Sequence, residues 1–400
     1  MKGSINKRAV ILFGAGASIE YNAPSTSGLT DVIEQKVMAD EWMKSSGGDK
    51  AFSKIKDGLK NYLKHPGIVQ FEQIYHCVHE LIYSFEPTSG AFDEFRPLLY
   101  PFFTNNTGLD ECSLRSLAKK MVEVIFAEVS ACCNGSPISL DPLTSFIKTL
   151  QDQYITRIYT TNYDDFPLQA VADMYTGFDS TLKPGSKRFD VDQFWNKEDL
   201  NSIFHLHGSV HMGFPHPIPP EGDIGELYWF DDRAEALQHC SFSGSDIRRM
   251  DGSSYLRTAV ITGLDKLSRI QQRPLSHFYS AMARDIMQAD VIFVIGSGLG
   301  DLHLNTWLKE SRLRKPATPL LFVDWWEDGF LETVEFDFDR KEIEMLHALR
   351  ILIGSHYPSI KYGSGWTVSN DQSAAVWDKG FQSFLNTPAE LQDVMKQLKL

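Results

Sequence analysis

The fold is decided by a stretch near the start of the chain that reads AVILFGAGAS over residues 9–18. Its first half, Ala9–Phe13, is continuously apolar, which predicts a strand buried on both faces, as in a parallel sheet. Gly14 and Gly16 follow at once and permit a tight turn in which backbone N–H groups can approach a phosphate. A strand, turn and helix without any ligand explain the same pattern, so this stretch alone predicts only local structure.

Further short apolar runs predict more buried strands of the same kind, with helical patterns between most of them. These runs are Ile155–Thr160, Ser202–Leu206, Ala259–Thr262, Val291–Ile295 and Leu320–Val323. Strands that alternate with helices form parallel sheets covered on both faces. We therefore expect an α/β fold with a Rossmann-like parallel sheet and helices on both of its faces.

Between Phe13 and Ile155 the chain shows only helical patterns. Apolar residues recur at three- and four-residue steps from Phe71 to Phe85 and again from Leu114 to Ile125, which is typical of amphipathic helices. The gap is too long for one crossover helix, so we interpret residues 38–140 as a helical insertion. The nucleotide-binding domain would then comprise residues 1–37 and 141–330, followed by a C-terminal helical extension at 330–400.

Composition narrows the class of protein. The 400 residues are 42% hydrophobic and 23% charged, which is ordinary for a globular protein. A net charge of −13 opposes direct binding of nucleic acid or of an anionic membrane. Five cysteines without a C-x-x-C pair predict free thiols and no metal site. The apolar run at residues 9–13 is too short for a signal peptide or a membrane span, so we expect a cytoplasmic location.

Polar residues follow two of the predicted strands where each one ends. Thr161, Asn162 and Asp164 follow Thr160, and His207 with Gly208 follows Leu206. Side chains at the carboxyl ends of parallel strands face the ligand crevice, where a histidine can act as a general base. The alternatives are that Asn162 or Asp164 caps a helix and that His207 is structural. We assign His205 and His211 to structural roles.

Two later strands end in the same manner. Val291–Ile295 runs into Gly296-Ser297-Gly298-Leu299-Gly300-Asp301, and Leu320–Val323 runs into Asp324, whose carboxylate can accept hydrogen bonds from a ribose or an adenine edge. Glycine or small polar residues at successive strand ends are what a large bound nucleotide requires. The dinucleotide fingerprint of hydride-transfer enzymes is incomplete, because its third glycine and its acidic residue are missing.

The order of these motifs resembles the sirtuin (SIR2) superfamily over about residues 9–330, and more narrowly the bacterial SIR2-like proteins of antiphage defence. The motifs are Gly14-Ala15-Gly16-Ala17-Ser18, Thr161-Asn162-Tyr163-Asp164, Leu206-His207-Gly208 and Gly296-Ser297-Gly298-Leu299. The four-cysteine zinc module of the deacylases is missing. Their Gly-Ile-Pro-Asp-Phe-Arg segment has no match near Ala23-Pro24-Ser25. The resemblance therefore implies a hydrolase that cleaves NAD, with NAD as substrate and no metal.

The resemblance also implies roles for the residues. Asn162 would orient water or a ribose hydroxyl, His207 would accept a proton, and Asp164 would bind the nicotinamide carboxamide. The pyrophosphate and the adenosine would be held by a larger set, namely Gly14, Ala15, Gly16, Ser18, Thr161, Gly296, Ser297, Asp301 and Asp324. Lys266 is either a further contact or a surface lysine.

Free hydrolysis of NAD would kill the host, so the resemblance implies an enzyme held inactive until a trigger arrives. Homo-oligomerisation or a separately encoded partner, such as a HerA-like ATPase or an Argonaute-type protein, would supply that control. Two other functions stay open. One is a sirtuin-type transferase that moves an acyl group or ADP-ribose, and the other is a non-catalytic module that binds NAD or ADP-ribose.

Overall fold

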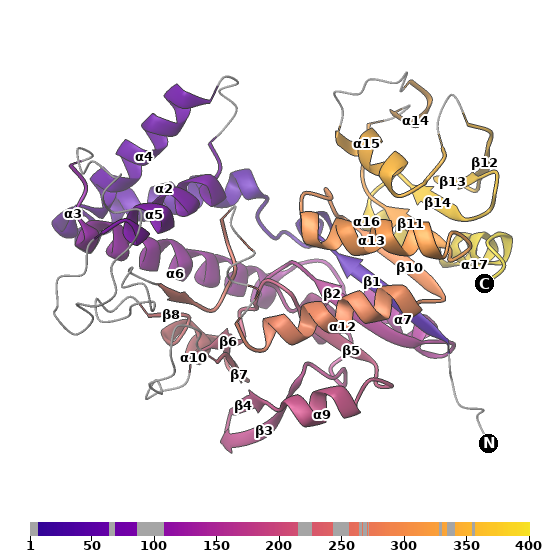
Figure 1. Cartoon of the computed structure of the whole chain (residues 1–400), viewed down its shortest axis with the longest axis horizontal. Helices are drawn as coiled ribbons and strands as arrows, with labels where there is room; N and C mark the ends of the chain where they lie inside the picture. Colours follow the sequence, from indigo (N-terminus) through magenta and orange to yellow (C-terminus); the bar gives the residue numbers. More distant parts are fainter. Residues whose placement is uncertain are drawn as a thin grey trace.

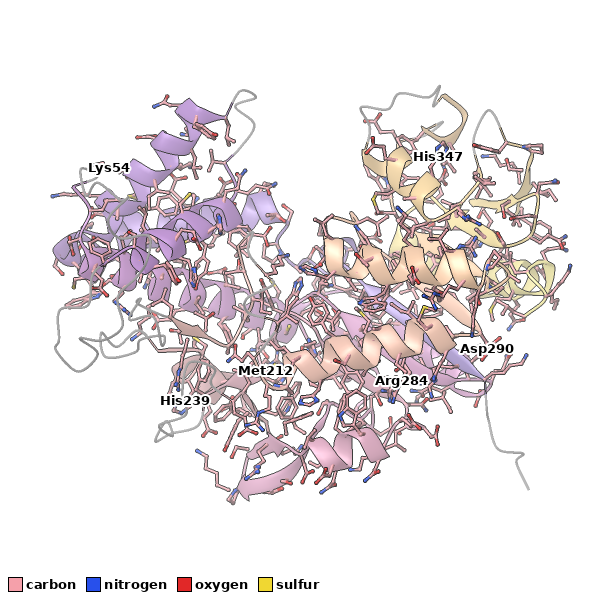
Figure 2. All side chains as sticks on the ribbon, in the orientation of Figure 1. Lys54, Met212, His239, Arg284, Asp290 and His347 are labelled. Atoms are coloured by element: carbon pink, nitrogen blue, oxygen red, sulfur yellow. The ribbon has the colours of Figure 1, made fainter. Side chains whose placement is uncertain are left out.

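The computed structural model describes residues 7–63, 69–85, 108–214, 226–242, 256–263, 266, 270, 272–327, 330–333, 341–353 and 357–400. One large sheet lies at the centre, and a group of N-terminal helices lies to one side of it (Figure 1). Side chains fill the space between the ribbons (Figure 2). None of the described helices combines the length and the apolar character that crossing a membrane requires.

The central sheet has eight strands in the order β12-β13-β14-β11-β10-β1-β2-β5. Six of them run parallel, and β12 and β13 form an antiparallel edge. The strands are β1 (Arg8–Phe13), β2 (Ile155–Thr160), β5 (Ser202–His205), β10 (Val291–Ile295), β11 (Leu320–Val323), β12 (Ser359–Tyr362), β13 (Trp366–Ser369) and β14 (Ala374–Trp377). The chain extends the sheet from β1 first through β2 and later through β10, so the strand order reverses at β1. Ligands of open α/β sheets bind at such a switch point.

Helices cover both faces of this sheet, as the sequence predicts. Phe13 and Phe293 share one face, where they contact Phe381 of α16 (Phe381–Leu385) and Phe146 of α7 (Asp141–Gln151), each with ring centroids 5.6 Å apart. Tyr159 points the other way and contacts α12 (Leu275–Gln288). Helix α13 (Leu302–Arg314) packs on α12.

Each secondary-structure element described between β1 and β2 is a helix. Side-chain caps begin several of these helices; for example, Asp110 accepts a hydrogen bond from the Ser113 N–H at 2.8 Å. The apolar face of α5 packs against α6. The helices are α1 (Ala15–Ile19), α2 (Thr26–Ala39), α3 (Glu41–Ser46), α4 (Gly48–Tyr62), α5 (Phe71–Tyr83) and α6 (Glu111–Gly135), followed by α7.

A smaller four-stranded sheet, in the order β3-β4-β7-β6, lies beside β5 together with short helices. Its elements and their neighbours are α8 (Phe166–Ala170), β3 (Phe178–Lys183), β4 (Ser186–Phe189), α9 (Val191–Asn196), β6 (Met212–Gly213), β7 (Tyr228–Phe230), α10 (Arg233–Gln238), β8 (Ser241–Phe242) and β9 (Arg257–Thr258).

Two expectations about secondary structure are wrong. Residues Ala259–Thr262 are not a strand of the central sheet, because their backbone bonds to loops: the Ile261 N–H donates to the His207 carbonyl at 2.7 Å. The tail at 330–400 is not purely helical. It contains α14 (Phe330–Thr333), α15 (Lys341–Ala348) and α17 (Pro388–Gln397), but also the strands β12, β13 and β14.

A buried charge network joins α12 to β1 and β2 beneath the sheet. The Asp285 carboxylate pairs with Arg8 and Arg157 and accepts a hydrogen bond from the Tyr159 hydroxyl at 2.6 Å. Arg284, labelled in Figure 2, adds a contact of 3.0 Å from the edge of the network. The two arginines and Tyr159 lower the pKa of Asp285 against the opposing effect of burial.

We predict that Asp285→Asn lowers the free energy of unfolding by about 3–5 kcal/mol, because two buried guanidinium groups lose their counter-charge. Urea denaturation measures this loss. Glu310→Gln, which breaks a surface pair with Arg314 on α13, is the control and should change stability by less than about 0.5 kcal/mol. A cost at Asp285 as small as the control's would contradict the role of the network.

Candidate active site

The turn after β1 and the turn after β10 pack backbone against backbone. The Gly16 N–H donates to the Gly296 carbonyl at 2.8 Å, and the Gly14 N–H donates to the Ile295 carbonyl at 2.9 Å. Gly296 has a φ of +61°, and a Cβ on it would lie 2.0 Å from the Ala17 nitrogen. These glycines therefore serve the contact between the two turns. Two N–H groups that we expected to face a phosphate are used inside the protein.

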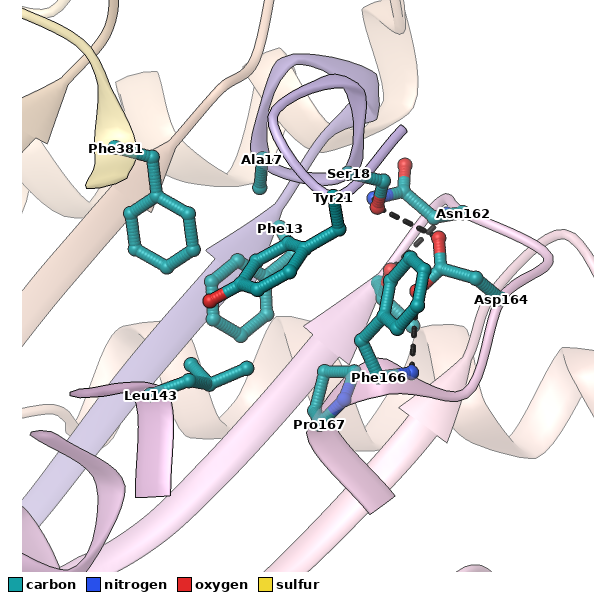
Figure 3. A pocket seen from close by; sticks show the side chains of 11 residues that line it. Phe13, Ala17, Ser18, Tyr21, Leu143, Asn162, Asp164, Phe166, Pro167 and Phe381 are labelled. Carbon is teal, nitrogen blue, oxygen red and sulfur yellow. Dashed lines mark hydrogen bonds between the residues drawn. The ribbon is translucent and has the colours of Figure 1, made fainter. Parts of the chain in front are cut away.

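Three polar side chains, those of Ser18, Asn162 and Asp164, form hydrogen bonds with one another next to this junction (Figure 3). The Asn162 Nδ2 donates to the Gly14 carbonyl at 2.9 Å and to the Ser18 Oγ at 2.7 Å. The Ser18 Oγ donates in turn to the Asp164 Oδ2 at 2.6 Å. Because both N–H groups of the Asn162 amide are engaged, its Oδ1 is the atom of this amide that remains to accept a hydrogen bond from a ligand.

Asp164 is buried, with 4% of its surface exposed. Burial raises the pKa of its carboxyl to about 6, although the hydrogen bond from Ser18 and the backbone N–H of Phe166 favour the charged form. The Oδ1 accepts only a long hydrogen bond of 3.3 Å from that N–H. This oxygen therefore keeps the capacity to accept or donate a further hydrogen bond.

A small pocket lies on the α7 face of this polar group (Figure 3). Its walls are mostly aromatic and aliphatic, and Phe381 of the C-terminal tail closes one side. The lining residues are Phe13, Ala17, Ser18, Tyr21, Leu143, Thr160, Asn162, Asp164, Phe166, Pro167 and Phe381. The tail is thus part of the wall behind the site, which the sequence did not indicate.

The second polar group surrounds His207 on the loop after β5. Its Nε2 lies 2.8 Å from the Asp301 Oδ2 and 3.0 Å from the Tyr279 hydroxyl. Burial lowers the pKa of His207, and the Asp301 carboxylate opposes this effect. Burial of Asp301 is outweighed by its contact with His207, which lowers the pKa of Asp301 to about 2. A neutral imidazole therefore faces an ionised carboxylate.

The helical insertion reaches this second group. Lys266 lies 3.7 Å from Glu72 at the start of α5, and Tyr75 and His76 of the same helix pack near Gly263. The charge of Lys266 lowers the pKa of His207, whereas the charge of Glu72 raises it. Lys266 is thus close enough to His207 to influence its charge state.

The structure brings most of the predicted site residues to one edge of the sheet. The strand pair Thr160–His205 places Asn162 and His207 on adjacent loops, each two residues past the paired position. The Thr161 N–H donates to the Phe13 carbonyl at 3.0 Å, which ties β2 to β1. Asp324 lies two strands from β1, where its backbone carbonyl accepts from the Gly380 N–H.

Two residues near His207, Tyr279 and Glu72, were not expected from the sequence, and Asp301 was expected in another role. Tyr279 lies within α12 and Glu72 within α5, where neither shows a sequence signal apart from the helical pattern. Asp301 was expected on the adenosine side, but it contacts His207 and also caps α13 by accepting from the His303 N–H at 3.2 Å. The sequence shows that Asp301 follows a glycine-rich turn, but it does not show that His207 is the partner of this carboxylate.

The five cysteines are free thiols, as expected. Among the residues that the structure describes, no three His, Cys, Asp or Glu side chains gather as metal ligands would.

Comparison with known families supports the resemblance for the motifs that follow β2, β5 and β10. The family model described as SIR2-like domain matches residues 156–335, a range that includes Asn162, His207 and Asp301 but not the turn after β1. Residues 156–335 are therefore similar to a SIR2-like domain. No curated protein matches the chain.

Solved structures of Sir2 proteins resemble this chain only distantly. An ADP-ribose complex of a mutant Sir2 homologue is 12% identical, with 87% of this chain and 94% of that chain covered and a TM-score of 0.36. An NAD complex of a Sir2 homolog is 14% identical, with 80% and 78% covered and a TM-score of 0.35. At this distance the two structures do not tell which residues of this chain act.

We predict that Asp164→Asn changes how stability depends on pH. Because the folded state raises the pKa of Asp164 to about 6, the folded protein binds this proton more tightly than the unfolded chain. The contribution of Asp164 to stability is therefore present at low pH and is lost as pH rises through about 6. Relative to wild type, the variant should gain about 2–3 kcal/mol between about pH 4 and pH 7.5.

Urea denaturation at several pH values measures this difference. Asp173→Asn, at an exposed position, is the matched control and should follow the wild-type pH profile. An Asp164→Asn profile that runs parallel to wild type would show that the carboxyl titrates normally.

Proposed function

We propose that this protein is an NAD+ hydrolase that cleaves the nicotinamide–ribose bond to give nicotinamide and ADP-ribose. The observation that carries the proposal is the position of Asn162 and His207 on adjacent loops at the carboxyl edge of the sheet, one and two strands from the switch point at β1. Each is held by buried partners, and both lie within the range that matches the SIR2-like domain.

The chemistry suits these residue types. The nicotinamide of NAD+ is a cation, so breaking its bond to C1′ returns the bonding electrons to the ring and releases neutral nicotinamide without an acid. Positive charge develops on the ribose, as in other glycosyl transfers. The protein must therefore hold the ribose, tolerate that charge and activate one water molecule.

His207 is proposed to activate the water. In this proposal Nε2 carries the proton, which the Tyr279 hydroxyl accepts at 3.0 Å beside the Asp301 carboxylate, and the lone pair resides on Nδ1. The water oxygen bonds to C1′ as the C1′–N bond breaks, and the water proton moves to His207. Asp301 fixes the ring and stabilises the imidazolium that forms. Asn162 orients the water or a ribose hydroxyl through its Oδ1.

The remaining predicted contacts bind the substrate in this proposal. Since the Gly14 and Gly16 N–H groups are engaged, the exposed Ala15 and the Ser297–Gly298 turn supply the donors that face the pyrophosphate. Asp164 binds the carboxamide of nicotinamide through Oδ1. Asp324 would lie toward the adenosine.

We further propose that the activity serves antiphage defence and is released by a trigger, because unregulated loss of NAD would kill the host. Homo-oligomerisation or a partner such as a HerA-like ATPase would provide this control. The helical insertion at 38–140 and the tail at 330–400 are the proposed contact surfaces, because α5 and Phe381 lie next to the two polar groups.

The test is incubation of the purified protein with NAD+, alone and together with the product of its neighbouring gene, followed by chromatography. Nicotinamide and ADP-ribose released without an acceptor are expected. Release only in the presence of an acylated peptide or another protein acceptor would indicate a transferase instead. Binding of NAD+ without turnover in every assembled state would indicate a non-catalytic module.

Variants assign the roles. We predict that Asn162→Ala and His207→Ala each lower kcat by at least about 1000-fold and that Asp301→Asn lowers it by about 10–100-fold, because the base and its orientation are lost. Asn386→Ala, at an exposed position after α16, should retain wild-type turnover. Full activity in either alanine variant of the site would remove that residue from the mechanism.

A further inference from the structure

We infer that the ion pair between Asp165 and His211 is a positioning device that holds the loop of Asn162 and Asp164 against the loop of His207. The inference rests on the proposed function, because it assigns the pair to the geometry of that site. His211, expected to be merely structural, takes a defined role within it.

The pair joins the two loops directly. The His211 Nε2 lies 2.9 Å from the Asp165 Oδ2, and neither residue belongs to a strand of the central sheet. Two further contacts cross the same boundary: the Val210 N–H donates to the Tyr163 carbonyl at 2.9 Å, and the His205 side-chain Nδ1 lies 3.2 Å from the Asn162 carbonyl. Among these contacts between the two loops, the one between Asp165 and His211 joins a carboxylate to an imidazole.

Further partners fix both members of the pair. The Asp165 Oδ1 accepts from the Gln169 Nε2 at 2.7 Å and lies 3.6 Å from Arg233 of α10. The His211 ring stacks on Trp229 of β7 with centroids 4.7 Å apart and an angle of 8°. The pair therefore also fastens the two loops to the smaller sheet.

Burial and charge make the pair strong. Asp165 is 4% exposed, and contacts with His211, Gln169 and Arg233 outweigh burial and hold the pKa of Asp165 well below its usual range. The His211 Nδ1 faces the Phe230 carbonyl at 2.8 Å, so both ring nitrogens face acceptors.

The consequence for the site follows from chain continuity. Asp165 directly follows Asp164 in the chain, and His211 lies four residues after His207. A shift of either loop therefore changes the separation of His207, the proposed base, from Asn162. A displacement of about 1 Å between reacting groups costs up to about 100-fold in rate. Loss of the pair should therefore slow the chemical step more than it weakens substrate binding.

The experiment compares wild type with Asp165→Asn, His211→Gln and the double variant, all in the full chain. Asp179→Asn is the matched control, because Asp179 forms a comparable ion pair with Lys197 at 2.6 Å and also binds a tyrosine, yet contacts neither loop. Hydrogen exchange of the peptides over 161–166 and 206–211 is measured by mass spectrometry, together with kcat and KM for nicotinamide release.

We expect exchange to accelerate in both loops together in each single variant, by about tenfold or more, with kcat about 10–100-fold lower and KM changed by less than about threefold. The double variant should be no slower than the slower single variant, because the two residues act as one unit. The control should match wild type. His211→Gln decides the matter if Asp165→Asn does not fold.

Exchange at wild-type rates in either loop would overturn the inference, and so would loosened loops with unchanged kcat. If wild type fails to cleave NAD+, the proposed function fails, while the exchange data still decide whether the pair joins the loops.

Discussion

The backbone contact between the turn after β1 and the turn after β10 is the constraint on which the site depends. Only glycine fits at Gly296, since a Cβ would overlap the Ala17 nitrogen and φ is positive. This contact fixes the start of α1 and therefore Ser18, to which Asn162 and Asp164 are hydrogen-bonded. A glycine-rich turn usually suggests a phosphate cradle, but here its first task is to bring two strand ends together.

Segments that are far apart in the sequence come together around this junction. The loops after β2 and β5 carry the two polar groups, α12 supplies Tyr279, α5 of the insertion brings Glu72 toward Lys266, and the tail adds Phe381. Parallel strands explain this convergence, because their carboxyl ends lie at one edge. Helix α5 and Phe381 of the C-terminal segment therefore lie beside the site.

Six strands were predicted from sequence patterns, and five of them are strands of the central sheet. Continuous apolar runs are strong signals for such buried parallel strands. Ala259–Thr262 has the same composition, but its backbone partners are loops, which no local pattern reveals. In the tail, β12 (SIKY) and β13 (WTVS) were missed because polar residues interrupt the apolar ones, so neither strand shows a continuous apolar run. At the site, the glycine-rich and polar motifs correctly predicted where the strands end. The contacts of His207 with Asp301 and Tyr279 required the tertiary fold, since the three residues come from separate elements.

We propose that one ribose carbon of NAD+ lies between the amide of Asn162 and the ring of His207. A crystal structure of the His207→Ala variant soaked with NAD+ tests it most directly, because uncleaved substrate should remain in place. We expect the nicotinamide ribose beside Asn162 Oδ1 and the space vacated by the imidazole, with the pyrophosphate over the turns after β1 and β10. NAD+ bound away from this edge, or with its adenosine end in that position, would contradict the account.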